Sequence, residues 1–300
     1  MEKFFRFKPC DCCELNQICS KYAIFDYTVV DNLICKTKIP ISSLKDYKSG
    51  KIYGIDYSSC VAVQSLIHDA DHNAKINIIE LCCAPGAKML YMMDYLPNCV
   101  VCGVDIRSDR LSVAKKLLRK YKHLDRAQLI VEDATICKIS VPCGFTEGRK
   151  YESRIFHSPR HFNQSDTYLF DRVLVDTECT LDGKEHHVPK GLAKCSFDSV
   201  SLFKLQQSVL LNGFKHMKEG GTLVYSTCSL KVHENECVVY NLLSIHKNAR
   251  LVVPSFWNKL PLDISEKHCE ICDKTYLIGM RMDKVHLKTS GMFVAVINKI

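Results

Sequence analysis

The sequence predicts an α/β fold in which a mostly parallel, doubly wound sheet is covered by helices on both faces. Three observations support this prediction. Short apolar runs alternate with helix-like segments along residues 76–245, which is typical of strands joined by crossover helices. Several runs end in an acidic residue, and the first leads through a Pro-Gly turn into a helical segment. Such a turn is how these folds bind a ligand at the carboxyl edge of the sheet.

The bulk composition is that of an ordinary globular protein. The chain has 300 residues, of which 47% are hydrophobic and 25% charged, enough for one substantial core. No apolar run is long enough to predict a membrane span, and the N-terminus lacks the apolar core of a signal peptide. We therefore expect an intracellular, cytoplasmic or nuclear monomer, with a mitochondrial location still open. The net charge of +8 favours a polyanionic partner such as RNA.

Eighteen cysteines are scattered through strand-like segments, so we expect mostly buried thiols and not disulfides. Two groups could in principle hold zinc. The N-terminal group is Cys10, Cys12, Cys13 and Cys19, where we expect buried or free thiols. The other is Cys269 and Cys272 beside His268, where we expect a hairpin of ordinary thiols. The sequence thus predicts no metal site.

Residues 1–48 are expected to form a short N-terminal extension, with a strand at 22–30, and residues 49–300 the main domain. Residues 50–59 end in a plausible N-cap pair, Ser58 and Ser59, before an apolar helix at 60–68.

The main domain then alternates strands and helices. Continuous apolar runs predict buried strands at 76–81, 98–105, 127–133, 170–176 and 222–228, with a closing strand at 291–297. Helices are expected at 88–95, 109–122, 201–217 and 234–245. Gly220 and Gly221 are expected to stop the third of these helices.

Two polar segments interrupt this pattern. Residues 138–164, rich in arginine, predict either a phosphate-contacting loop or a solvated surface excursion. The loop with His186 and His187 follows the fourth strand, and we expect neither histidine to be catalytic.

Four strand ends are expected to meet at one edge of the sheet: the turn at residues 82–88, Asp105, Asp133 and Asp176. Gly86 would let the backbone approach a ligand, because a Cβ would stand in its way. A carboxylate after the second strand suits ribose hydroxyls, and one after the third could meet an adenine amino group. The turn lacks the G-x-G-x-x-G of nicotinamide sites. It suits S-adenosylmethionine, whose sulfonium group needs no pyrophosphate cradle.

Three motifs in this order resemble those of one family. Cys82-Cys83-Ala84-Pro85-Gly86-Ala87-Lys88 resembles the cofactor turn of the RsmB/Nop/Sun-type RNA cytosine-5 methyltransferases. Asp176-Thr177-Glu178-Cys179 is similar to the family's fourth motif, and Ser226-Thr227-Cys228-Ser229 to its sixth. Residues 50–59, 233–236 and 289–297, with Asp105 and Asp133, also fit. The resemblance covers roughly residues 48–245 and the last strand.

The resemblance implies a seven-stranded, Rossmann-like sheet of the class I S-adenosylmethionine-dependent methyltransferase type. It implies that the cofactor is bound by Cys82, Cys83, Ala84, Pro85, Gly86, Ala87, Lys88, Asp105, Asp133 and Asp176. For Lys88, a place near the donor carboxylate competes with ordinary helix surface. The implied substrate is a cytosine in tRNA or rRNA, in an unpaired or distorted site from which the base can leave its stack.

The chemistry explains why such an enzyme needs two cysteines. C5 of cytosine is too poor a nucleophile to take a methyl group unaided, and attack of a thiolate on C6 activates it. The resemblance makes Cys228 this nucleophile. It places Cys179 where the C5 proton is removed after methyl transfer, with Asp176 at the hydrogen-bonding edge of the base.

The chain departs from the family pattern in three ways. Glu178 stands where the family usually has Pro, Gly86-Ala87 replaces Gly-Gly, and the N-terminal RNA-binding module is largely missing. These departures support one alternative, a catalytically weak or inactive RNA-binding assembly factor with the same fold. Methylation of a small molecule or protein would leave both cysteines unexplained.

Overall fold

The computed structural model describes residues 3–7, 34–139, 155–157, 168–183, 198–260, 263–270, 272–282 and 290–300. The strand expected at 22–30, the N-terminal cysteine group, most of the 138–164 insertion, and His186 and His187 lie outside these residues. Among the described helices, none combines the length and the apolar character needed to cross a bilayer.

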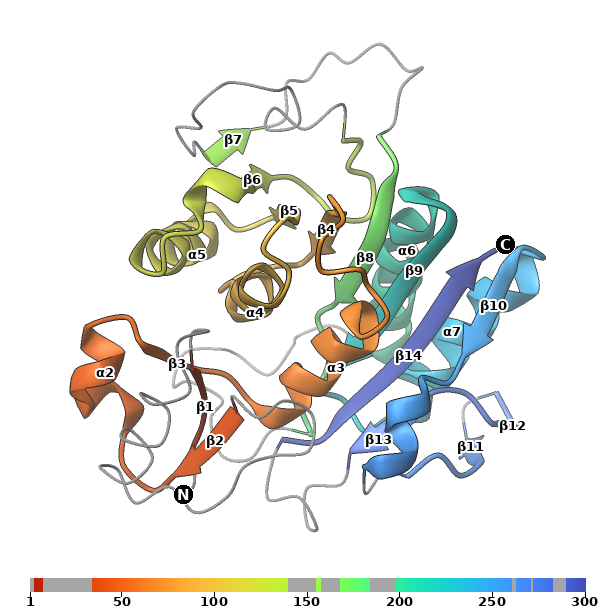
Figure 1. Cartoon of the computed structure of the whole chain (residues 1–300). Helices are drawn as coiled ribbons and strands as arrows, with labels where there is room; N and C mark the ends of the chain where they lie inside the picture. The colour runs from red at the N-terminus through yellow and green to blue at the C-terminus, as the bar shows by residue number, and fades with distance from the viewer. Residues whose placement is uncertain are drawn as a thin grey trace.

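One large sheet organises the molecule (Figure 1). Its strands are β4 (Asn77–Leu81), β5 (Val100–Asp105), β6 (Ala127–Val131), β7 (Ile155–His157), β8 (Phe170–Asp176), β9 (Met217–Thr227), β10 (Ala249–Val252), β13 (Met280–Met282) and β14 (Met292–Lys299). Their order is β10-β14-β9-β8-β4-β5-β6-β7, with β13 also paired to β14. The strands from β9 to β7 run parallel, whereas β14, β10 and β13 pair antiparallel.

The doubly wound, mostly parallel fold is therefore confirmed. In the described part of the chain the sheet has nine strands, two more than the predicted seven. Three strands at the edges of the sheet, β7, β10 and β13, were not located from the sequence. Each has only three or four residues, which carry little periodic signal.

Helices cover both faces of the sheet (Figure 1). They are α3 (Tyr57–Ile67), α4 (Ala87–Tyr95) and α5 (Ser108–Lys120) on one face, and α6 (Ser199–Lys215) and α7 (Glu236–Ile245) on the other. Successive strand residues point to opposite faces. Ile78 accordingly joins the core under α3 to α5, and Ile79 the core under α6 and α7. This two-sided burial explains why the strands are continuous apolar runs.

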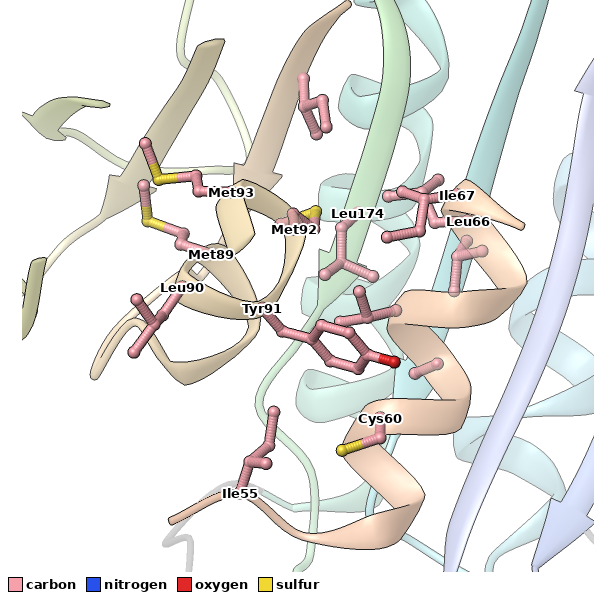
Figure 2. Close-up of a cluster of buried hydrophobic side chains, with 14 of the residues drawn as sticks. Ile55, Cys60, Leu66, Ile67, Met89, Leu90, Tyr91, Met92, Met93 and Leu174 are labelled. Carbon is pink, nitrogen blue, oxygen red and sulfur yellow. The ribbon is translucent and has the colours of Figure 1, made fainter. Parts of the chain in front are cut away.

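Figure 2 shows the core between α3 and α4, where Tyr91 reaches from α4 toward α3. The Nε2 of Gln64 on α3 donates a hydrogen bond of 2.7 Å to the Tyr91 hydroxyl, so this buried phenol is satisfied. Methionines of α4, including Met89 and Met92, fill the space beside the sheet. This packing fixes α4, whose N-terminus carries the predicted cofactor turn.

A small second sheet contains β1 (Lys3–Phe7), β2 (Ile34–Thr37) and β3 (Ile52–Gly54), in the order β2-β1-β3. It crosses the domain boundary predicted at residue 48. Arg6 ties it to α4, because its buried guanidinium lies 3.3 Å from Asp94 and stacks over the Tyr91 ring at 4.2 Å. Asp94 also contacts Nε2 of His123 at 2.6 Å.

The remaining elements are short. They are α2 (Lys45–Lys48), the 3₁₀ helices η1 (Ile41–Ser43), η2 (Leu124–Arg126), η3 (Val232–Glu234) and η4 (Ser255–Lys259), and a hairpin of β11 (Lys267–Cys269) and β12 (Lys274–Tyr276).

Two predicted helix boundaries were wrong. Helix α3 begins at Tyr57 with Asp56 in the N-cap position, so Ser58 and Ser59 lie inside it. Helix α6 ends at Lys215, and Gly220 lies within β9 with φ +73°. There the pairing of β9 with β8 shifts its register. In this second case the pairing of β9 with β8, which begins at Met217, follows the helix directly and includes the glycines in the strand.

Candidate active site

The sheet order brings the predicted site residues to one edge. Strands β9, β8, β4, β5 and β6 are successive neighbours and run parallel, so their carboxyl ends lie side by side. Cys228 follows β9, Asp176 and Cys179 stand at the end of β8, and the 82–88 turn follows β4. Asp105 ends β5, and Asp133 follows β6. Five strands span roughly 19 Å at ~4.8 Å per step, so the cysteines and Asp133 lie at opposite ends of the site.

Asp105 holds the predicted cofactor turn in place. Its Oδ2 accepts a hydrogen bond of 3.1 Å from the backbone N–H of Ala84, and its Oδ1 one of 3.0 Å from that of Arg107. Arg110 also bonds the carbonyl of Ala84. Asp105 is only 2% exposed. Each carboxylate oxygen can accept a further hydrogen bond, so the residue can shape the turn and still receive a ribose hydroxyl.

The packing of Gly86 gives a reason for glycine that was not predicted from the sequence. Its φ is +96°, a conformation that side chains disfavour. A Cβ there would lie 3.0 Å from the Cβ of Ala114 on α5. Glycine thus allows the start of α4 to approach α5, and the approach of a ligand to Gly86 stays a prediction.

Gly86→Ala is expected to lower the free energy of unfolding by about 2 kcal/mol, because left-handed strain adds to the contact with Ala114. Gly220→Ala is a matched control. It has φ +73°, and a Cβ there meets nothing within 4 Å, so about 1 kcal/mol is expected. Urea unfolding of both variants measures the difference. Equal losses would show that the contact with Ala114 has no cost.

Asp133 stands half-buried at the far end of the edge. Its Oδ1 accepts hydrogen bonds from the backbone N–H of Thr135 at 2.8 Å and from the Thr135 hydroxyl at 2.7 Å. This local turn holds the carboxylate at the end of β6, in line with Asp105.

Lys88 joins the turn at residues 82–88 to the end of β8. Its Nζ lies 2.6 Å from Oδ2 of Asp176, and the hydroxyl of Ser226 donates 2.8 Å to Oδ1 of the same carboxylate. The Lys88 side chain is 12% exposed. Burial alone lowers its pKa, but the attraction of Asp176, Glu80 and Cys228 outweighs burial, so the pKa of Lys88 is raised. Lys88 is therefore a buried cation within the site and not helix surface.

The two predicted catalytic cysteines are in contact. Their sulfur atoms lie 3.1 Å apart, Cys228 is half-buried, and Cys179 is 2% exposed behind it. The hydrogen bond to Cys228, and then burial, raise the pKa of Cys179. The attraction to Cys228 that raises the pKa of Lys88 also stabilises a thiolate on Cys228. The arrangement is thus a half-buried thiol in contact with a buried thiol whose proton is hard to remove.

The cysteines of the cofactor turn have a different environment. Burial raises the pKa of both Cys82 and Cys83, and the Asp105 carboxylate adds to the effect. They are held as neutral thiols, which are poor nucleophiles.

Glu234, for which no role was predicted, braces the loop that carries Cys179. This carboxylate is fully buried. Its Oε2 accepts a hydrogen bond of 3.0 Å from the backbone N–H of Thr180, and its Oε1 one of 2.8 Å from the Thr180 hydroxyl. Gln206 on α6 donates to Glu234 at 3.3 Å and to the carbonyl of Glu178 at 2.9 Å. Side chains thus hold the loop at the position where the family usually has proline.

Asn235 and Gly183 hold the loop with Cys228 in a similar way. The Thr227 hydroxyl donates 2.6 Å to Oδ1 of Asn235, whose Nδ2 donates 2.9 Å to the carbonyl of Ser229. The carbonyl of Cys228 accepts 2.8 Å from the N–H of Gly183. The resemblance at 233–236 was the available signal for Glu234 and Asn235, but their roles depend on contacts between distant segments.

Comparison with known proteins identifies the family of this chain. The family model described as 16S rRNA methyltransferase RsmB/F matches residues 66–298. The chain belongs to this family. The predicted family is thereby confirmed, and the match includes the 82–88 turn, both cysteine loops and β14 up to Asn298.

Curated relatives are longer than this RsmB/F chain. It is 28% identical over 216 residues to the ribosomal RNA small subunit methyltransferase B of Photorhabdus laumondii, covering 71% of this chain and 43% of the relative. It is 30% identical over 223 residues to that of Shigella boydii, covering 74% and 45%. The chain thus spans less than half of either relative.

Solved structures show the same fold. A methyltransferase homolog from Pyrococcus horikoshii, 22% identical, superposes with a TM-score of 0.68 over 100% of this chain and 87% of its own. NSun6 from the same organism, solved with SFG, is 20% identical with a TM-score of 0.61, over 88% and 57%. The predicted class I methyltransferase fold is confirmed, and S-adenosylmethionine is the cofactor of this family member.

The residues at the edge fit that cofactor. Acidic side chains of β5, β6 and β8 offer acceptors for hydroxyl and amino groups, and the turn holds no phosphate cradle. Two buried polar atoms at this edge, Oε2 of Glu80 and Oγ1 of Thr177, have no hydrogen-bond partner among the described residues. Buried polar atoms are normally paired, so they suit a polar ligand.

Proposed function

We propose that this chain is an RNA cytosine-5 methyltransferase, with Cys228 as the nucleophile and Cys179 as the base. The observation that carries this proposal is the pair of sulfur atoms 3.1 Å apart at the ends of β8 and β9. One thiol is accessible and the other is buried, beside the Lys88–Asp176 ion pair. A methyltransferase without a covalent step has no use for two thiols in this position.

In the first step the Cys228 thiolate bonds to C6 of the cytosine. The π electrons of the C5–C6 double bond then become available at C5, which is how a covalent adduct divides a difficult reaction into easier ones. Lys88 favours the anionic form of Cys228 through its positive charge. S-adenosylmethionine, when bound, supplies the methyl group that C5 accepts.

In the second step the proton on C5 leaves, the C5–C6 double bond re-forms, and the Cys228 thiolate is expelled. Cys179 is the base for this proton. The first cause that raises its pKa is the hydrogen bond to Cys228, and that bond is lost while the Cys228 sulfur is bonded to carbon. Adduct formation thus lowers the pKa of Cys179, so that its own proton can pass to solvent water and the resulting thiolate can take the proton from C5.

Asp176 is proposed to position the target base. It ends β8 next to both cysteines, and its Oδ1 and Oδ2 are held by Ser226 and Lys88. A carboxylate in this place can accept a hydrogen bond from the exocyclic amino group of cytosine. Lys88 compensates the charge of this carboxylate, which matters most when a bound base covers the site.

We assign the cofactor to the other end of the edge. The proposed contacts are the predicted ones: the backbone and side chains of residues 82–88, with Asp105, Asp133 and Asp176. Asp105 is proposed to bind the ribose hydroxyls, and Asp133 the adenine amino group. Asp176 lies between these residues and the cysteines, where cofactor and target base meet.

The proposed substrate is a cytosine in tRNA or rRNA. The basic net charge of +8 suits a polyanion. A cytosine must leave its stack to reach Cys228, at a cost of a few kcal/mol in a duplex and less in a loop. An unpaired or distorted site is therefore favoured.

Transfer of a labelled methyl group to RNA tests the function. The full chain is incubated with labelled S-adenosylmethionine and RNA, and the RNA is digested to nucleosides. We expect the label in 5-methylcytidine, and bisulfite mapping of cellular RNA with and without the protein locates the cytosine. Donor binding without label in any nucleoside would favour the inactive assembly factor.

Glu234→Ala is expected to reduce kcat by about 10²-fold, because misplacing a catalytic group by about 1 Å has an effect of this size. The donor's Kd should hardly change, since Glu234 contacts the Cys179 loop and not the 82–88 turn. Glu234→Gln keeps one acceptor and should retain more activity. An equal loss of donor binding in both variants would mean that Glu234 only supports the fold.

A further inference from the structure

We propose that Cys237, Cys269 and Cys272 bind one Zn²⁺ ion through their three thiolates, with water in the fourth position. This site is independent of the proposed methylation chemistry. From the sequence we expected a hairpin of ordinary thiols at Cys269 and Cys272, with His268 beside them.

The third ligand comes from a distant segment. Cys237 lies in the first turn of α7, Cys269 ends β11, and Cys272 lies in the turn before β12. All three sulfur atoms lie within 4.8 Å of one another, and those of Cys237 and Cys272 are 3.7 Å apart. Tetrahedral zinc with Zn–S bonds of ~2.3 Å requires sulfur atoms about 3.8 Å apart. The cluster is thus close to the geometry of a bound ion before any ion is added.

The spacing and the surroundings also suit zinc. Cys269 and Cys272 form the C-x₂-C pair common in structural zinc sites. The Tyr276 hydroxyl lies 3.2 Å from the sulfur of Cys272, and the backbone N–H of Lys274 bonds to the same sulfur. Donors of this kind around a metal-bound thiolate orient it and offset its charge. Soft thiolate ligands in a tetrahedral arrangement select zinc over the hard cations.

His268 does not belong to the cluster. It is exposed, its Nδ1 faces the Thr275 hydroxyl at 3.4 Å, and its Nε2 faces Asp273 at 3.5 Å. Successive strand residues point to opposite sides, so His268 points away when Cys269 points inward. Among the described residues, the cluster holds three metal-binding side chains, which leaves one position for water.

The fold gives this ion a structural task. β11 and β12 have three residues each and form a separate two-stranded sheet, and an isolated hairpin of this size is marginal in water. The apolar cluster that joins it to α7 is small, with Cys237, Cys269 and Tyr276 as its buried members. A metal bond to Cys237 would fasten the hairpin to the start of α7. That helix follows Glu234 and Asn235, which hold the two cysteine loops of the active site.

Metal content of the purified full chain tests the proposal. The protein is prepared without chelator, and zinc is measured by inductively coupled plasma mass spectrometry. We expect about one zinc per chain. Cys272→Ser and Cys237→Ser should each lose most of it. Cys272 is exposed, so its replacement should fold normally. His268→Ala, next to Cys269 and exposed, is the matched control and should retain zinc.

Titration with metal alone gives a second readout. Zn²⁺ added to the metal-stripped protein should raise its melting temperature, because a ligand of the native state stabilises it. Co²⁺ should give a thiolate-to-cobalt charge-transfer band that is absent from Cys272→Ser. A stripped protein that takes up neither ion would overturn the proposal, as would zinc retained in both cysteine variants or a Cys237–Cys272 disulfide in protein kept under reductant.

Discussion

Cys228→Ala is expected to abolish methyl transfer, with a loss of about 10⁴-fold or more, the scale seen when an enzyme loses its nucleophile. The variant should also fail to form a covalent adduct with RNA that contains 5-azacytidine. In this analogue nitrogen replaces C5, so no proton can leave and the Cys228–C6 bond persists. Denaturing gel electrophoresis of labelled RNA with the protein measures the adduct directly.

Cys99→Ala is the matched control for this experiment. Cys99 precedes β5, at the opposite edge of the sheet, and burial raises its pKa to about 11. The control should form the adduct like the unmodified protein. If Cys228→Ala still forms an adduct while Cys99→Ala behaves normally, another residue is the nucleophile and the proposed mechanism is wrong.

Cys179→Ala is expected to stop turnover in the opposite way, by trapping the adduct with ordinary cytosine RNA. The nucleophile is intact, so attack on C6 and methyl transfer proceed. The C5 proton then has no base, and the C6–S bond cannot break. One equivalent of label should become attached to protein-bound RNA, with a fall in product release of about 10²- to 10⁴-fold, the usual range for general acid–base catalysis.

The double variant Cys179→Ala/Cys228→Ala provides the control. It should form no adduct, because the sulfur that bonds to RNA is gone. Normal turnover of Cys179→Ala without any adduct would contradict the assignment of the base, but it would leave Cys228 as the nucleophile. The two predictions can therefore fail separately.

Much of the candidate site at the carboxyl edge of the sheet could be predicted, because the ends of strands can be recognised from the local sequence. Apolar runs that end at Asp105 and Asp176 were identified with their correct ends, and parallel strands place such ends together. The ion pair of Lys88 with Asp176 could not be predicted in this way. It depends on β4 and β8 being neighbours, although 88 positions separate the two residues.

Glu234 shows the same limit. The sequence showed that Glu234 lies in a segment resembling the family. It did not show that Glu234 accepts hydrogen bonds from Thr180, because α6 and β9 separate the two residues in the chain. Gly86 shows a further limit of prediction from the sequence. Its need for a positive φ is local, whereas the close approach to Ala114 follows from the packing of α4 against α5. The additional strands at the edges also form through pairing with β14 and β6, and not through their own short sequences.

The sequence by itself determined the family, the α/β class, the order of strands and helices along the chain, and the residue types that the chemistry needs. These properties follow from short-range patterns: period, turn residues and motif spacing. Only the tertiary structure decided which charges pair, that the sulfur atoms of Cys179 and Cys228 are in contact, and that Cys237 joins Cys269 and Cys272. Those contacts link residues far apart in the chain, and the order of strands in the sheet and the packing of helices on it set their distances.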